Sequence, residues 1–138
     1  MALKTIKLEM PQAKYSIKCP NPMVPEYIVI HNTANDASAE NEIRYMQSNN
    51  AYTSFHYAVD DKEAVQGVDL WRNAWHAGDG ANGPGNRKGI AIEIYYSKSG
   101  GSRFTTAEQN AAELAATLLI DFGWDISHIK KHQDFSGK

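Results

Sequence analysis

The segment YIVIH, residues 27–31, is the stretch on which the fold prediction rests. Its apolar, β-branched residues are typical of a buried strand, and His31 stands where that strand ends. A second run, GIAIEIYYS over residues 89–97, has the same character. Side chains alternate across a strand, so this run divides between two faces. One face carries Ile90, Ile92 and Ile94, and the other carries Ala91, Glu93 and Tyr95.

Two helices are predicted from helical spacing and capping residues. Ser38 can cap a helix over residues 39–48. The buried stripe of this helix is expected to consist of Ala39, Ile43 and Met46. A longer helix is expected to begin at Thr105, which can form a capping box with Glu108. It should end at Gly123, which stands where a C-terminal cap belongs.

The remaining segments complete the predicted order of elements. Residues 53–61 and 63–69 are expected to form strands, and residues 124–132 a short strand or extended segment. Residues 69–88 are rich in glycine and are predicted to form a long surface loop. Residues 1–25, with four prolines, are predicted to be an irregular arm laid over the domain. The resulting prediction is an α/β fold with a single mixed β-sheet flanked by helices.

Composition narrows the class of protein. At 138 residues the chain has the length of one domain with a single core. The net charge of −2 gives no electrostatic reason to expect nucleic acid or an anionic membrane as a partner. No apolar stretch approaches the roughly 20 residues of a membrane span, and the first residues do not read as a signal peptide. Cys19 is the single cysteine, which fits a chain made in a reducing compartment.

His31, Glu93, His132 and Lys138 are the candidate residues for chemistry. Imidazoles on rigid elements, together with a carboxylate that does not bind the metal, are the usual parts of a catalytic zinc site. Glu93 is predicted to lie mid-strand, where an ionised carboxylate needs a partner or a wet cleft. The alternatives are a packed histidine at the core's rim and a solvated, outward-facing glutamate. Spacing leaves these alternatives open, because about 100 residues separate His31 from His132.

Four segments together resemble the type 2 N-acetylmuramoyl-L-alanine amidases, the zinc family shared by phage endolysins, bacterial autolysins and animal peptidoglycan recognition proteins. They are YIVIHNTAND (27–36), SFHYAVDD (54–61), NAWHAGDGANGPGNRKGIAIEI (73–94) and KKHQDFSGK (130–138). The resemblance runs from about Tyr27 to Lys138 and is closest to endolysins of Gram-positive phages and prophages. It implies the amidase and peptidoglycan recognition protein-like fold, with residues 1–138 as an amidase catalytic domain.

The resemblance also implies a role for each candidate residue. His31 and His132 match the family's zinc-binding histidines. Glu93 matches the glutamate that activates the metal-bound water in many members, and Lys138 matches the lysine that stabilises the oxyanion. The bond cut in this family is the amide between the lactyl group of N-acetylmuramic acid and L-alanine of the stem peptide. The implied cofactor is therefore Zn²⁺.

The predicted substrate-binding residues are Trp71, Trp75 and His76. In this family the corresponding region borders the substrate groove; the alternative is a loop packed down by its own aromatic side chains. His56 and His128 are predicted to be structural.

The sequence departs from the family pattern at two places. Phe55 stands where some members carry a tyrosine with a role in catalysis, so Glu93 is expected to act as the base alone. The family's third zinc ligand, a cysteine or aspartate, is expected eight residues after His132 and two positions beyond Lys138. We therefore expect a catalytic domain shortened at its C-terminus, with its third protein ligand just beyond the chain end. Cys19 is predicted to be a packed small residue rather than a substitute ligand.

The leading hypothesis is a zinc-dependent endolysin-type enzyme that lyses the cell wall. Such an enzyme would be made in the host cytoplasm without a signal peptide and would act on the wall after release. Its partner would be peptidoglycan or a muropeptide, with neither nucleic acid nor membrane, and we expect a monomer. One alternative is a non-catalytic peptidoglycan-binding module that lacks the third zinc ligand. Another is a different zinc hydrolase, such as a peptidase that cuts within the stem peptide.

Overall fold

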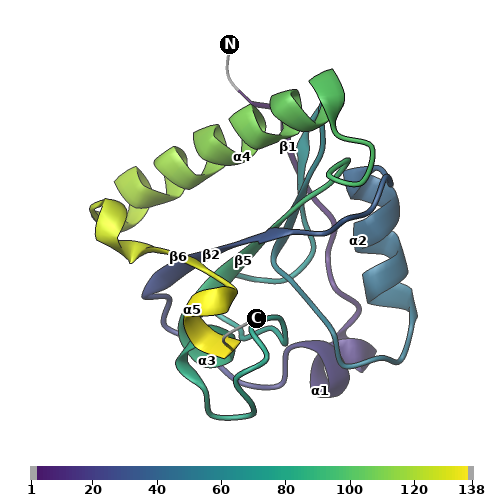
Figure 1. Cartoon of the computed structure of the whole chain (residues 1–138). Helices are drawn as coiled ribbons and strands as arrows, with labels where there is room; N and C mark the ends of the chain where they lie inside the picture. Colours follow the sequence, from purple (N-terminus) through teal and green to yellow (C-terminus); the bar gives the residue numbers. More distant parts are fainter. Residues whose placement is uncertain (1–2, 137–138) are drawn as a thin grey trace.

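A mixed sheet lies at the centre of the computed structural model, which describes residues 3–136 (Figure 1). Its strands are β1 (Thr5–Lys7), β2 (Tyr27–Asn32), β3 (Tyr57–Val59), β4 (Ala64–Gln66), β5 (Gly89–Ile94) and β6 (Ile129–Lys131). Their order across the sheet is β1-β4-β3-β5-β2-β6. Strands β3, β5, β2 and β6 run parallel, whereas β4 is antiparallel to β3 and parallel to the edge strand β1. The predicted single mixed sheet is confirmed.

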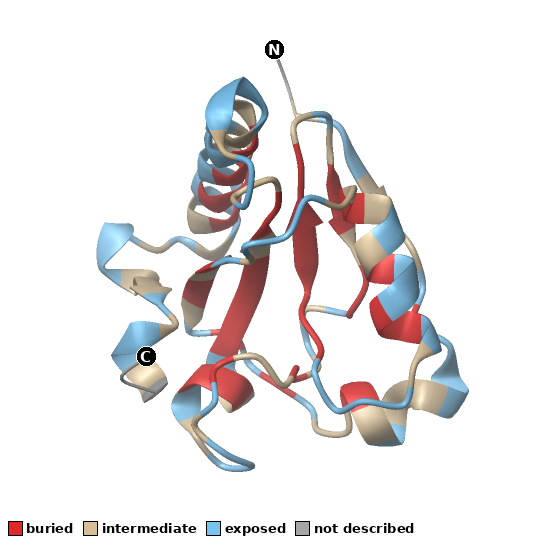
Figure 2. Ribbon diagram, turned by 45° about the vertical axis from the view of Figure 1, so that its right-hand side comes forward, coloured by how far each residue is buried: buried red, intermediate tan, exposed pale blue. Residues whose placement is uncertain are grey.

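Helices cover both faces of the sheet, as Figure 2 shows. The long helix α4 (Gly101–Phe122) packs on one face, and α2 (Ala39–Ser48) packs on the other. The shorter helical segments are η1 (Gln12–Lys14), α1 (Tyr15–Lys18), α3 (Pro84–Lys88), η2 (Ile126–His128) and α5 (Gln133–Ser136). The molecule is therefore a three-layer α/β structure, with a core on each side of the sheet.

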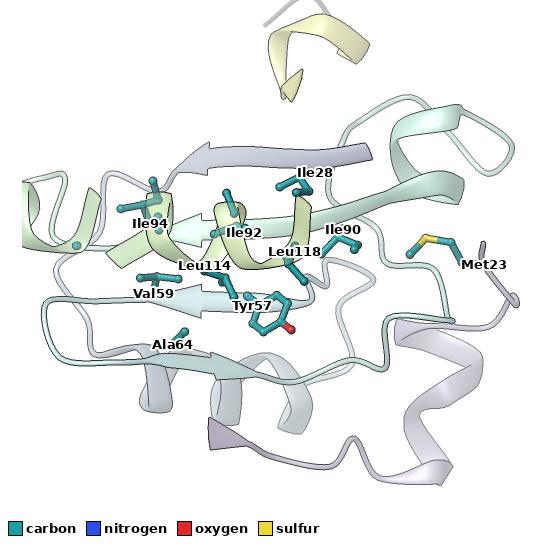
Figure 3. Close-up of a cluster of buried hydrophobic side chains, with 13 residues drawn as sticks. Met23, Ile28, Tyr57, Val59, Ala64, Ile90, Ile92, Ile94, Leu114 and Leu118 are labelled. Atoms are coloured by element: carbon teal, nitrogen blue, oxygen red, sulfur yellow. The ribbon is translucent and has the colours of Figure 1, made fainter. Parts of the chain in front are cut away.

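The predicted alternation of side chains along β5 divides the core into these two clusters. The cluster toward α4 includes Ile90, Ile92, Ile94, Leu114 and Leu118 (Figure 3). The cluster toward α2 includes Ile43, Met46, Ala58, Ala91 and Tyr95. Because Glu93 lies between Ala91 and Tyr95 in the alternation, its side chain belongs to the α2 face of the sheet.

The ends of the helices agree with the sequence prediction at three of four places. Helix α2 covers the predicted residues, and the Ser38 side chain accepts a hydrogen bond from the Asn41 amide. Helix α4 ends at Gly123, which has the left-handed φ of 69°. The predicted start at Thr105 is wrong, because the helix begins at Gly101. Gly100 and Gly101 take positive φ values that turn the chain into the helix early, and the Thr105 hydroxyl donates to the Gly101 carbonyl inside the first turn.

The N-terminal arm is more regular than predicted. Residues 5–7 pair with β4 and extend the sheet, and residues 12–18 form the consecutive turns η1 and α1. Lys18 is fully buried, and its ammonium donates to the Asn49 side chain and to the Thr53 carbonyl. Prolines interrupt the arm locally, but these contacts with distant residues order it. The predicted strands over residues 53–61 and 63–69 are present in shortened form as β3 and β4.

Within residues 3–136, no helix has the length and apolar character needed to cross a membrane.

Candidate active site

Three neighbouring parallel strands bring the predicted site residues to one edge of the sheet. His31, near the end of β2, is the register partner of Glu93 on β5. On the other side of β2, Ile30 pairs with Lys131, so His132 follows directly beyond the end of β6. Parallel strands place their carboxyl ends at the same edge, where ligands of open α/β sheets usually bind. The structure thus brings together His31, Glu93 and His132, which are distant in the sequence.

The rings of His31 and His132 lie side by side, with centroids 5.0 Å apart. They border a cavity of about 350 Å³. The cavity is lined by Ile30, His31, Asn32, Lys131, His132 and Gln133. Two imidazoles beside an opening of this size can contact a metal ion or a substrate from the same side.

His31 is held in its neutral form by its surroundings. The residue is only 8% exposed. This burial, reinforced by the nearby His132, lowers the pKa of His31 from 6.5 to about 4. At neutral pH the ring therefore keeps one nitrogen lone pair. A neutral imidazole is the form that binds zinc, since a ligand nitrogen must be free of its proton.

His76 lies directly against His31, although it was predicted only as a substrate-binding residue. Its Nδ1 is 3.1 Å from Nε2 of His31, and its Nε2 is 3.2 Å from the Gly89 carbonyl oxygen. Burial, and then the neighbouring His31, hold the pKa of His76 well below 6.5. No spacing rule in the sequence indicates this contact, because the two histidines come from a loop and a strand 45 positions apart.

The loop that carries His76 is fastened by hydrogen bonds from two polar side chains. The buried Asn86 side chain accepts from the backbone amides of His76 and Ala77, at 2.8 Å each. Asp79 in turn accepts from the amides of Gly85 and Asn86. The predicted long loop over residues 69–88 is therefore ordered, and it ends in the short helix α3.

Glu93 is a half-buried carboxylate with an unusual pKa. Burial, and then the charge of Glu42 on α2, raise the pKa of Glu93 from 4.5 to about 7. A carboxyl group with such a pKa can both take up and release a proton near neutral pH. The alternative of a freely solvated Glu93 is wrong, because the side chain lies in the layer beneath α2.

The two predicted tryptophans lie apart from this edge. Trp71 is 56% exposed and packs against Phe122 at the end of α4, with ring centroids 6.1 Å apart. Helix α4 covers the opposite face of the sheet from His31, so Trp71 and His76 lie on different sides of the sheet, and their role in binding substrate stays a prediction. Trp75 donates its indole N–H to the Ile17 carbonyl and so fastens the N-terminal arm.

The other predictions near the site have clear outcomes. His56 is fully buried and uses both ring nitrogens, at 2.8 Å from the Arg72 carbonyl oxygen and 3.0 Å from the Ala91 amide. Its predicted structural role is confirmed. Cys19 is buried, as expected for a packed small residue.

Lys138 lies outside the described residues. Over residues 3–136, no group of three or more His, Cys, Asp or Glu side chains is arranged to hold a metal ion.

Comparison with known proteins identifies close relatives. A family model described as N-acetylmuramoyl-L-alanine amidase matches residues 21–138. The chain is 59% identical over 138 residues to the N-acetylmuramoyl-L-alanine amidase CwlA of Bacillus subtilis (strain 168). This alignment covers 100% of the chain and 51% of CwlA. The chain is also 59% identical to the amidase XlyB of the same strain, over 100% of this chain and 44% of XlyB. The chain spans about half the length of these curated relatives.

The solved structure of PlyL has the same fold. It superposes with a TM-score of 0.94 at 51% sequence identity, and the match covers 100% of this chain and 85% of the PlyL chain. The agreement extends over the whole sheet and its helices, which confirms the fold class predicted from the sequence.

Proposed function

The chain belongs to the N-acetylmuramoyl-L-alanine amidase family, and from this membership we propose that it hydrolyses the amide bond between the lactyl group of N-acetylmuramic acid and L-alanine in peptidoglycan. We also propose Zn²⁺ as its cofactor and residues 1–138 as a catalytic unit that acts on the bacterial cell wall as a monomer. The observation that carries the proposal is the convergence of His31, His132 and Glu93 at one edge of the sheet.

The chemistry of the donor set supports zinc. His31 and His132 would hold the ion, since neighbouring imidazoles beside an open cavity are suitable nitrogen donors for it. The depressed pKa of His31 means that no proton has to be displaced from the ring at neutral pH. When bound, zinc would supply Lewis-acid polarisation of the scissile carbonyl and of a water molecule.

Glu93 would move the proton during hydrolysis. It would take a proton from the attacking water as the water oxygen forms a bond to the carbonyl carbon. The same proton would then pass to the alanine nitrogen as the C–N bond breaks, which leaves a free amine on the peptide and a carboxylic acid on the lactyl group. The acid then ionises by releasing the second proton of the water to solvent. A pKa raised to about 7 suits both transfers near neutral pH.

Lys138 is proposed as the cation that stabilises the oxyanion formed on the carbonyl. This role rests on the sequence resemblance, because Lys138 lies outside the described residues.

The proposal is tested on purified cell walls by asking which bond is cut. The 138-residue chain, freed of metal and then supplied with Zn²⁺, should release peptides with a new amino-terminal L-alanine and should create no new reducing sugars. His31→Ala should lose both zinc binding and hydrolysis. His128→Ala is the matched control, because His128 stacks on Trp124 away from the sheet edge.

Each other outcome contradicts a specific part of the proposal. Wall binding without cleavage would indicate a peptidoglycan-binding module. A new amine on a residue other than L-alanine would indicate a peptidase that cuts within the stem. Full hydrolysis by the metal-free chain would exclude the zinc-dependent mechanism.

A further inference from the structure

The hydrogen bonds around His76 define which of its ring nitrogens carries a proton. Nε2 of His76 lies 3.2 Å from the carbonyl oxygen of Gly89. A carbonyl oxygen can only accept, so Nε2 must be the donor and the neutral ring has its lone pair on Nδ1. The reverse arrangement would place two lone pairs against each other at this distance.

The same reasoning extends to His31. Nδ1 of His76 lies 3.1 Å from Nε2 of His31. Since Nδ1 of His76 is the acceptor, Nε2 of His31 must carry the proton and donate it. The lone pair of His31 is then on its Nδ1. A chain of two hydrogen bonds, from His31 through His76 to the Gly89 carbonyl, thus selects one tautomer of His31.

The position of His76 is itself rigidly determined. Its backbone amide donates to the buried Asn86 side chain at 2.8 Å. A Cβ atom added at Gly89 would lie 2.7 Å from both the Gly85 carbonyl oxygen and Cγ2 of Val29, and 3.5 Å from Cε1 of His76. Because Gly89 has no side chain, strand β5 can begin close to α3, and the Gly89 carbonyl stays within reach of the His76 ring.

We propose that His76 is a positioning residue for the metal site. Its Nδ1 accepts the Nε2–H hydrogen bond of His31 and so holds His31 in the orientation and tautomer that bind zinc through Nδ1. The inference rests on the proposed function, because it assumes that His31 is a zinc ligand. Ligand histidines commonly donate their second N–H in this way, and loss of the partner lowers metal affinity by about 10- to 100-fold. His76 here supplies the acceptor that a carboxylate or carbonyl usually supplies.

The hydrogen bond can be observed without zinc. In the metal-free chain labelled with nitrogen-15, His31 should be protonated at Nε2 and His76 at Nε2. A scalar coupling between Nε2 of His31 and Nδ1 of His76 should be detected across the hydrogen bond. A proton on Nδ1 of either ring would overturn the inference.

Two substitutions separate positioning from packing. His76→Leu fills most of the space but offers no acceptor, so zinc affinity measured by chelator competition should fall about 10- to 100-fold. His76→Asn places a carbonyl oxygen where Nδ1 lies, so it should restore affinity to within about threefold of the unsubstituted chain if the lost acceptor is the cause. His128→Asn is the control on a histidine outside the site, which stacks on Trp124, and it should leave zinc affinity unchanged.

The results also separate this inference from the proposed function. If neither the unsubstituted chain nor a version extended past Lys138 by the expected third ligand binds zinc, the proposed function fails, and the coupling in the metal-free chain still shows whether the hydrogen bond exists. If the unsubstituted chain and His76→Leu bind zinc equally, His76 has no positioning role while the amidase proposal stands. Amide spectra of both variants show whether they are folded. If His76→Leu unfolds, His76→Asn decides, and weak binding by a folded His76→Asn would overturn the inference.

Discussion

Replacing Glu93 by glutamine should make the metal-free protein more stable while abolishing hydrolysis. Glu93 lies half-buried beneath α2, and burial and the charge of Glu42 raise its pKa from 4.5 to about 7. In the unfolded chain this carboxyl loses its proton near its ordinary pKa. Between these values the folded state therefore holds a proton that the unfolded state has released. The free energy of unfolding must fall as pH rises through this window and stay low above it.

The size of the effect follows from the width of that window. One pH unit corresponds to about 1.4 kcal/mol, so ionised Glu93 lowers the free energy of unfolding by up to about 3 kcal/mol near pH 8. Glutamine has almost the same shape and no charge. Glu93→Gln should therefore be more stable than the unsubstituted chain by up to about 3 kcal/mol near pH 8, and by less than about 1 kcal/mol near pH 5.

The assay is urea unfolding followed by tryptophan fluorescence, with a chelator present because a bound cation would favour the carboxylate. Glu108→Gln, on the exposed surface of α4, is the matched control and should change stability by no more than about 0.5 kcal/mol. An equal gain for Glu93→Gln at both pH values would show that Glu93 does not ionise inside this window. Hydrolysis of cell walls by Glu93→Gln at the original rate would refute its role as the base.

Three further perturbations test the packing around the site. In Glu93→Gln, the free energy of unfolding should fall as pH drops from about 6.5 to 4. Three buried imidazoles have lowered pKa values in the folded state, so in this range only the unfolded state binds protons on these rings. A free energy of unfolding that does not change with pH would contradict this. The three are His31, His56 and His76. Lys18→Met should lower stability by about 1–3 kcal/mol, since it leaves the Thr53 carbonyl and Asn49 side chain without their donor; unchanged urea unfolding would argue against that contribution. Gly67→Ala should lower the melting temperature, because its Cβ would lie 2.7 Å from Cγ2 of Ile43; an unchanged melting temperature would mean that α2 shifts freely.

Local patterns were sufficient to predict most of the elements. The alternation in residues 89–94 predicts which side chains of β5 face α4 and which face α2, because the period of two is a property of the strand itself. Ser38 and Gly123 mark helix ends for the same reason, since a cap acts on neighbouring backbone groups. The start of α4 was missed because two glycines with positive φ begin the helix, a conformation that residue type permits but does not require.

The candidate site required both kinds of information. Residue chemistry made His31, Glu93 and His132 candidates, and family resemblance gave each a role. Spacing alone could not choose between the alternatives, because their separations along the chain have no meaning until β5, β2 and β6 lie side by side in register. The tertiary structure also separates two residues of the predicted substrate loop. It directs Trp71 to the end of α4 and His76 to His31, although both residues come from one loop.

The sequence by itself determined most of the strands, the two long helices, the two-faced core and the chemical types available at the site, because each depends on residues that are neighbours in the chain. Only the tertiary structure decided which histidine contacts which, how far Glu93 is removed from water, and which tautomer of His31 is favoured. These properties depend on burial and on hydrogen bonds between residues distant in the sequence, such as those that join His31, His76 and Gly89. Strand register and the packing of the whole molecule bring these residues together.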